Sequence, residues 1–345
     1  PTGVSMTAGR MRYSSSGEVR SGSLAMQAVK AQRLESRLIG NFEWSYYQRR
    51  FDGVRVDVDR PRWHFNASAF VPTQGGFEES TNLSMPRIQI GATSLALKNS
   101  NVEWQGFGYL YRDRRGPMAV VDNRFALDRR VNVTIATVGG AYVRMLPRDS
   151  GEYDLVGWAA AQAGDWYGQS HRAASVALEG GHKWMRAPLR PWLRAGYLWA
   201  SGDRNAGDDR HGTFFQMIPS SRQYALSATY AQMNLSDAFA QLMIEPRGVR
   251  ARIDLHALHL VSGADLWYAG SGPTSSDGRF FGFAGRAARG HTGLGTVLEG
   301  TIDVPIRKHW SINGYAGTMS AGPVVRNWFT NRRLTLWSIE NVVRF

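Results

Sequence analysis

Apolar and polar residues alternate along most of this chain, and the alternation is its main structural signal. In VRVDVDR, Val54, Val56 and Val58 are separated by charged residues, and VRARIDLHAL from Val249 repeats the pattern. A period of two places successive side chains on opposite faces of a β-strand. Helical periodicity is scarce by comparison, so the pattern predicts an all-β protein.

The pattern predicts about fourteen strands, joined by connections that alternate between short and long. The strands are expected near 4–13, 54–60, 62–72, 87–98, 102–113, 131–146, 152–166, 171–185, 190–201, 235–245, 249–262, 294–306, 308–320 and 334–345. Short turns fall near 59–61, 99–101, 147–151, 187–189, 246–248 and 307, with one more at 168–170 among the longer connections. The longer ones lie near 14–53, 74–86, 115–130, 202–234, 263–293 and 321–333.

Long irregular connections count against a compact soluble domain. Short turns on one side and long loops on the other are typical of transmembrane β-barrels. Residues 1–345 are therefore predicted to form a single antiparallel transmembrane β-barrel domain, whose loops near 14–53, 202–234 and 263–293 point outward. The final residues, SIENVVRF, are expected to be the closing strand, with Ile339, Val343 and Phe345 facing lipid.

The amino-acid composition restricts the chemical class of the binding partner. The chain has a net charge of +13 and a pI of about 10.3, and 37 of its 41 basic residues are arginine. This balance indicates an anionic partner, and arginine presents a planar fork that binds carboxylate or phosphate bidentately. There is no cysteine, which excludes disulfides and thiolate metal sites. No run approaches the roughly 20 apolar residues of a membrane helix.

Arginines on the polar faces of the strands are the best functional signal. Strand parity directs nine cations towards the lumen: Arg10, Arg12, Arg55, Arg144, Lys183, Arg194, Arg250, Arg252 and Arg344. Candidate counter-charges are Asp57, Glu179, Asp254, Glu299, Asp303 and Glu340. Rings of arginine form anion pathways. The alternative is a static lattice of salt bridges that holds the barrel in shape.

The connection 14–53 is a candidate gate because it carries Arg33, Arg37, Arg49 and Arg50. It would fold over or into the pore. The alternative is a solvated surface loop that touches acidic lipopolysaccharide. Seven aromatic residues are interpreted as interfacial girdle, with stacking on sugar rings left open: Trp158, Trp184, Trp192, Tyr197, Trp199, Trp310 and Trp337.

Catalysis is not expected. The chain has no Gly-x-Ser-x-Gly nucleophile motif, and its histidines lack the spacing of metal ligands. We therefore predict no enzyme activity, no cofactor and no metal.

Two blocks resemble the alginate-export family of outer-membrane barrels. The first contains Gly9-Arg10, Trp44 and Phe51-Asp52-Gly53, and the second contains Gly202-Asp203, Thr213-Phe214, Pro219 and Asn234-Leu235. The resemblance implies a Gram-negative outer membrane and export of an acidic polysaccharide through an arginine-lined pore. It also implies eighteen strands, so either strands precede Pro1 or this barrel is smaller.

The function predicted is passive export of an anionic, alginate-like exopolysaccharide. The expected partners are that polymer, outer-membrane lipid, lipopolysaccharide and periplasmic export proteins, and not nucleic acid. Two alternatives stay open: a generic or small-anion-selective porin, and a soluble basic β-protein that binds acidic glycans or nucleic acid.

Overall fold

The computed structural model describes residues 2–21, 23–43, 45–116, 121–124, 132–220 and 229–344. Within these residues, fourteen strands pair in chain order into one antiparallel sheet. They are β1 (Gly3–Met11), β2 (Phe51–Asp59), β3 (Trp63–Pro72), β4 (Ile88–Lys98), β5 (Val102–Asp113), β6 (Val133–Arg148), β7 (Gly151–Trp166), β8 (Gln169–Lys183), β9 (Trp192–Ala200), β11 (Leu235–Ile244), β12 (Arg250–Leu260), β15 (Gly293–Arg307), β16 (Trp310–Ala321) and β17 (Arg333–Val343).

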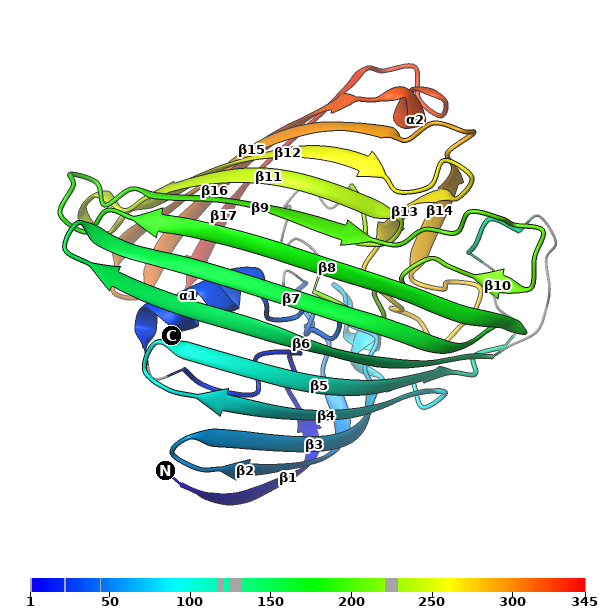
Figure 1. Ribbon diagram of the computed structural model, residues 1–345, viewed down its shortest axis with the longest axis horizontal. Coiled ribbons are helices and arrows are strands. Elements are labelled where there is room, and N and C mark those ends of the chain that lie inside the picture. The colour runs from blue at the N-terminus through cyan, green and yellow to red at the C-terminus, as the bar shows by residue number, and fades with distance from the viewer. Residues whose placement is uncertain are drawn as a thin grey trace.

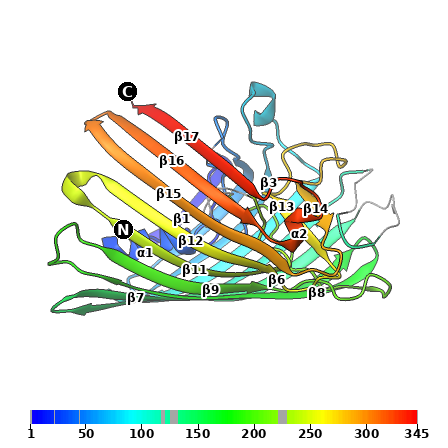
Figure 2. The same ribbon diagram turned by 90° about the horizontal axis from the view of Figure 1, so that it is seen from above.

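These fourteen strands confirm the pattern prediction to within a few residues. The order runs from β1 at one edge of the sheet to β17 at the other, and no ladder between these two is recorded in the described residues. Figures 1 and 2 show the sheet curving into a wall, with the short turns and both ends of the chain on one side and the long loops on the other. A two-residue strand, β10 (Arg210–His211), adds to β8 in parallel.

The two faces of the wall differ in polarity in the sense opposite to a soluble protein. Large apolar side chains such as Leu97, Leu110 and Leu178 are exposed on the outer face. The inner face carries buried polar residues such as Asn66, Gln162 and Gln241. Outward apolar and inward polar alternation is the pattern of a transmembrane barrel.

Elements within the connections were not predicted. The first long connection contains helix α1 (Leu24–Arg33), capped by the Ser23 side chain, which accepts a hydrogen bond from the Met26 backbone N–H. Residues 263–293 contain a hairpin of β13 (Leu266–Gly270) and β14 (Phe283–Ala287). The remaining turns of helix are η1 (Glu79–Asn82), η2 (Pro246–Gly248) and α2 (Pro323–Arg326). None of the described helices is long and apolar enough to cross a membrane.

The last strand has the predicted parity. Ile339 lies opposite Gly314, and Glu340 lies opposite Asn313 on the other face of the sheet. Ile339 is 71% exposed, as expected of a lipid-facing residue. The expectation for Phe345 and the motif residue Trp44 both fall outside the described residues.

Candidate functional site

The connection between β1 and β2 enters the interior, so the prediction that it points outward is wrong. Its helix α1 lies inside the curve of the sheet (Figure 1). Lys30 forms a fully buried ion pair with Glu103 on the inner face of β5, with Nζ 2.5 Å from the carboxylate. Farther along, Ile39 forms a parallel β-bridge with Ile218 of another long connection. Of the two alternatives for this segment, the structure therefore selects insertion over a solvated surface loop.

The inserted segment brings two of its arginines to a carboxylate of the wall. Arg33 donates to both oxygens of Glu179 on β8, from Nε at 2.6 Å and from Nη2 at 3.2 Å. Arg37 Nη2 lies 3.2 Å from the same carboxylate. From β9, Arg194 Nη2 lies 2.7 Å from Asp154 on β7 and 3.6 Å from Glu179.

We call these five side chains the lumen arginine cluster. All are at most 5% exposed. Three guanidinium groups and two carboxylates give the cluster a charge of +1 (3 − 2). Water screens buried charges poorly, so the interaction energy of these ion pairs depends on their geometry much more than it would on an exposed surface.

Aromatic rings support the same cluster. The Arg33 guanidinium lies 4.1 Å from the ring centre of Phe239, and that of Arg37 lies 5.0 Å from Trp158. Trp158 and Trp192 are 4% and 6% exposed, so the interpretation of these two as interfacial girdle is wrong. The Trp192 Nε1–H instead donates to Asp154 at 2.8 Å. Cations over ring faces are stabilised by the ring quadrupole.

The inserted segment fits closely against the wall. A cavity of about 40 Å³ remains between α1 and the wall, bordered by Val29, Glu152, Asp154 and Lys183 among others. That is room for only a few water molecules. In this structure the segment therefore occupies the space at the short-turn side of the lumen.

Arg49 joins three long connections. Its guanidinium donates to five backbone carbonyls at 3.1–3.5 Å, those of Gly40, Ile218, Pro219, Ser271 and Pro273. Burial lowers the pKa of Arg49 to about 9, so it stays protonated at neutral pH. Arg50 is less buried and reaches Gln48 and the Arg49 carbonyl within its own segment.

Other predicted lumen residues form smaller ion pairs on the inner face. Arg55 lies 2.6 Å from Asp57 on β2, and Arg252 lies 2.5 Å from Asp254 on β12. Near the short turns, Glu245 lies 3.2 Å from Lys183 and 3.3 Å from Arg250. Arg10 pairs with Asp52 and Arg12 with Glu43. Both arginines are exposed and alternate with the buried Met11 and Tyr13, and Met11 lies opposite the buried Phe51, so the placement of Arg10 and Arg12 in the lumen is wrong. These pairs do not join the lumen arginine cluster.

A third predicted lumen residue, Arg144, also lies on the other face. On β6 the neighbours Val143 and Met145 are buried and Arg144 is exposed, so the placement of Arg144 in the lumen is wrong. Asp303 and Glu340 lie on the inner parity, each opposite Asn313. The Arg344 side chain is exposed. Its backbone N–H donates to the His309 carbonyl at 2.8 Å.

Sequence reasoning missed three charged partners, Lys30, Glu103 and Asp154. Asp154 shares parity with the buried Val156 and Trp158, which was an available signal for an inward carboxylate. Glu103 shares parity with the buried Phe107 and Tyr109 in the same way. Lys30 had no such signal, because its pairing depends on the path of the inserted segment.

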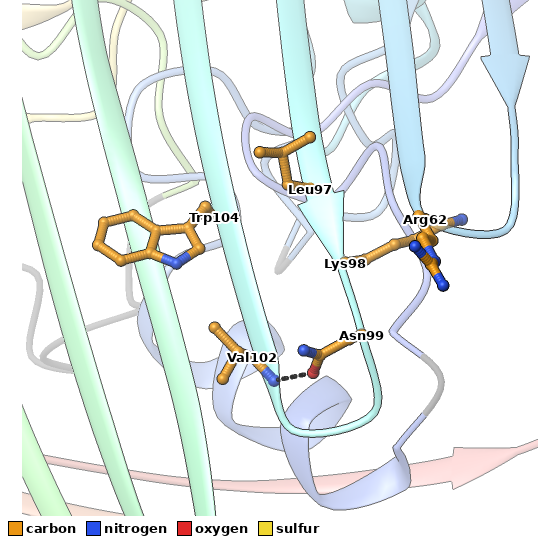
Figure 3. A pocket seen from close by; sticks show the side chains of 6 residues that line it. All are labelled: Arg62, Leu97, Lys98, Asn99, Val102 and Trp104. Atoms are coloured by element: carbon orange, nitrogen blue, oxygen red, sulfur yellow. Dashed lines mark hydrogen bonds between the residues drawn. The ribbon is translucent and has the colours of Figure 1, made fainter.

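A hollow of about 600 Å³ lies on the outer face and is separate from this site (Figure 3). Leu97 and Trp104 border it and are 55% and 57% exposed, beside Arg62 and Asn99 of the short turns. Because its apolar walls belong to the outward set, it faces the surroundings of the barrel and not the lumen.

An antiparallel wall with apolar residues outside and ion-paired arginines inside defines an outer-membrane β-barrel channel. A family model described as alginate export matches residues 12–334, and the chain belongs to this family. No curated protein matches the chain.

Two solved structures from Pseudomonas aeruginosa share the fold at 10% sequence identity. OccD3 (OpdP) has a TM-score of 0.57, with 99% of this chain and 75% of that chain covered. OccK11 (OpdR) has a TM-score of 0.54, with 91% and 76% covered. Membership of a channel family removes the soluble glycan- or nucleic-acid-binding alternative and agrees with a protein that is not an enzyme.

Proposed function

We propose that this channel conducts an anionic polysaccharide of the uronate class passively across a Gram-negative outer membrane, outward from the periplasm. The observation that carries the proposal is the lumen arginine cluster, which holds Arg33, Arg37 and Arg194 on the interior side of the wall. The description of the family, alginate export, names a polymer of the same chemical class.

The chemistry of the cluster suits a carboxylate ligand. A uronate chain carries one carboxylate per sugar, and each guanidinium can bind one bidentately. Glu179 already occupies such a position, bridging Arg33 and Arg37. A passing uronate would exchange with Glu179 for the same donors, so each contact is replaced and not simply lost. Exchange of this kind keeps binding weak enough for release.

Passage of a polymer requires the inserted segment to move, and we propose that it is the gate. Among the contacts that the segment makes with carboxylates of the wall are the pairs of Lys30 with Glu103 and of Arg33 with Glu179. A polyanion offers replacement carboxylates to both cations. The substrate itself therefore lowers the free energy needed to withdraw the segment from the wall.

The test replaces Arg33 and Arg37 together by glutamine in the full chain. Charge-assisted hydrogen bonds contribute roughly 1.5–3 kcal/mol, so block of the single-channel current by uronate oligomers should weaken by about tenfold or more. The control is Arg20→Gln, which removes one positive charge at an exposed arginine of the same connection, against two in the double variant. Its block constant should stay within about twofold of wild type. A heat-induced gel shift checks that each variant forms the barrel.

Two results would contradict the proposal. One is unchanged uronate block in the double variant. The other is an equal loss in the Arg20→Gln control, which would trace the effect to general charge and leave a small-anion channel as the better account.

A further inference from the structure

A second group of chemically active side chains lies on β12 and β15, apart from the lumen arginine cluster. Asp254, His256 and Glu299 each present one ligand atom, and these atoms lie within 4.8 Å of one another. All three side chains are at most 2% exposed. Asp254 lies directly opposite Glu299 in the β12–β15 ladder, while Asp254 and His256 are two apart on one strand and share its inner face.

The histidine is oriented by a fourth residue. His256 Nδ1 lies 3.1 and 3.0 Å from the two oxygens of Asp237 on β11. A carboxylate only accepts hydrogen bonds, so Nδ1 carries a proton, and in the neutral imidazole Nε2 is left with its lone pair. Tyr230 donates to the same carboxylate at 3.1 Å, which fixes Asp237 in place.

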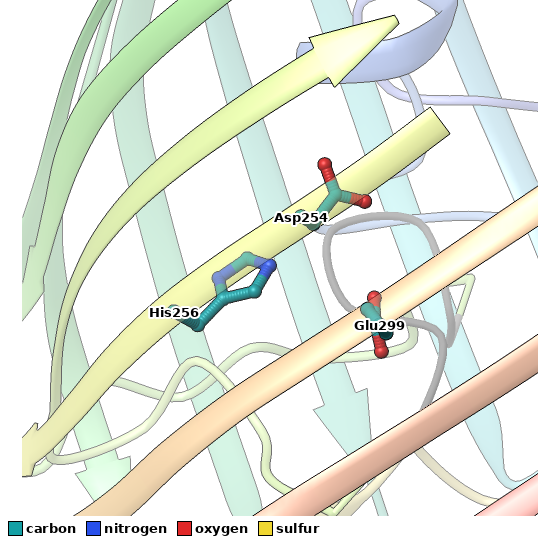
Figure 4. A group of neighbouring side chains, drawn as sticks. All are labelled: Asp254, His256 and Glu299. Atoms are coloured by element: carbon teal, nitrogen blue, oxygen red, sulfur yellow. The ribbon is translucent and has the colours of Figure 1, made fainter. Parts of the chain in front are cut away.

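The second nitrogen of this imidazole, Nε2, has no partner within the part of the chain that the structure describes. His256 Nε2 is buried and forms no hydrogen bond with any residue that the structure describes. Figure 4 shows the ring extending from β12 on the side where the Asp254 and Glu299 carboxylates lie. A buried acceptor without a donor is costly, and the cost disappears if Nε2 binds a cation.

Hydrogen-bond donors position the two carboxylates. Gln241 Nε2 donates to Asp254 at 2.8 Å, and the Tyr315 hydroxyl donates to Glu299 at 3.2 Å. Arg252 adds one positive charge beside Asp254. A bound dication would interact favourably with both carboxylates, which lie directly opposite each other across the ladder.

We propose that Asp254, His256 and Glu299 form a binding site for a divalent transition-metal ion of the Mn²⁺ or Zn²⁺ class. One imidazole and two carboxylates are the donor set for such ions, and the histidine hydrogen-bonded through its other nitrogen to a carboxylate is the arrangement that supports metal-bound histidines. The ion would join β12 to β15 on the lumen side. The prediction of no metal site considered sequence spacing alone and did not include ligands from two strands.

The test measures Zn²⁺ and Mn²⁺ binding to the detergent-solubilised full chain after chelator treatment, by titration calorimetry and metal analysis. We expect one ion per chain, with affinity at least tenfold lower in both His256→Gln and Glu299→Gln. Asp237→Asn should weaken binding about 10–100-fold, because it supports a ligand without being one. The control is His259→Gln, on the exposed face of β12, which should bind as wild type does.

X-ray absorption of the metal-loaded wild type provides a readout that needs no variant. It should show one imidazole nitrogen and oxygen ligands in the first coordination shell. The proposal is overturned if the wild type binds no ion saturably, if the bound ion shows no nitrogen ligand, or if a correctly folded His256→Gln variant binds with unchanged affinity.

Discussion

Whether strand parity places a charged residue on the correct face depends on what lies across the lumen from that residue. Parity placed Arg194 and Arg252 on the inner face correctly, since their strands contrast polar and apolar faces clearly. It failed for Arg144 because both faces of β6 carry apolar residues. The inner face there packs against inserted chain, with Thr137 near Met217. A lumen filled by protein removes the polarity contrast on which parity arguments depend.

Asp265 gives a residue-scale prediction for pH. Its buried carboxylate accepts hydrogen bonds from Thr213, Tyr268 and two backbone N–H groups, those of Asp203 and Leu266. Burial outweighs these donors and raises its pKa from 3.8 to about 6. The folded state therefore binds the proton more tightly than the unfolded state. Asp265 joins the connection 263–293 to the connection 202–234 through Asp203 and Thr213. The free energy that holds these two connections together therefore decreases as pH rises from about 4 to 6, by about 1 kcal/mol between pH 5 and 7.5.

Hydrogen exchange measured by mass spectrometry, corrected for intrinsic rates, checks this. Protection of residues 262–268 should be several-fold greater at pH 5 than at pH 7.5 in wild type, and the difference should shrink in Asp265→Asn. Asp277→Asn, at a partly exposed aspartate of the same connection that pairs with Arg279, should leave the difference between the two pH values unchanged. Equal protection of the wild type at both pH values would show that Asp265 does not titrate in this way.

At the scale of elements, the strands could be predicted and the path of the connections could not. Alternation and turn length are local signals, and they located all fourteen strands of the sheet. The course of residues 12–50 depends on contacts distant in sequence, such as Arg33 with Glu179. Helix α1 did have a local signal, because LAMQAVKAQR contains mostly strong helix formers after an N-capping serine.

Arg49→Met tests how these connections are held together. The substitution removes the donors of five backbone carbonyls and leaves the apolar volume of the side chain. Because buried acceptors without donors cost roughly 1–3 kcal/mol each, we expect the three connections to separate more readily and chymotrypsin cleavage within them to accelerate by at least about tenfold. Digestion followed by peptide mapping measures this.

Arg50→Met is the matched control. Within the described residues, the Arg50 side chain donates hydrogen bonds only to Gln48 and to the Arg49 carbonyl, both in its own segment. Its cleavage rate should resemble that of wild type. If Arg49→Met is as resistant as wild type, the connections are held by their other contacts and Arg49 is not the residue that joins them.

At the scale of the whole molecule, the charge balance and the fold support the same account. A chain with a net charge of +13 forms a wall whose apolar residues face outward, and its inserted segment places buried guanidinium groups along the interior. Composition predicted an anionic partner, and alternation predicted the wall. Neither could show that part of the positive charge lies on a segment inside the lumen, because insertion is a property of the assembled fold.

The most direct test of the central claim, that the lumen is built for a polyanion, is a planar-bilayer recording of the wild-type channel. We predict an anion-selective reversal potential in a salt gradient. We also predict current block by uronate oligomers at concentrations where neutral oligosaccharides of equal length have no effect. A cation-selective or non-selective channel, or equal block by the charged and neutral oligomers, would contradict the account.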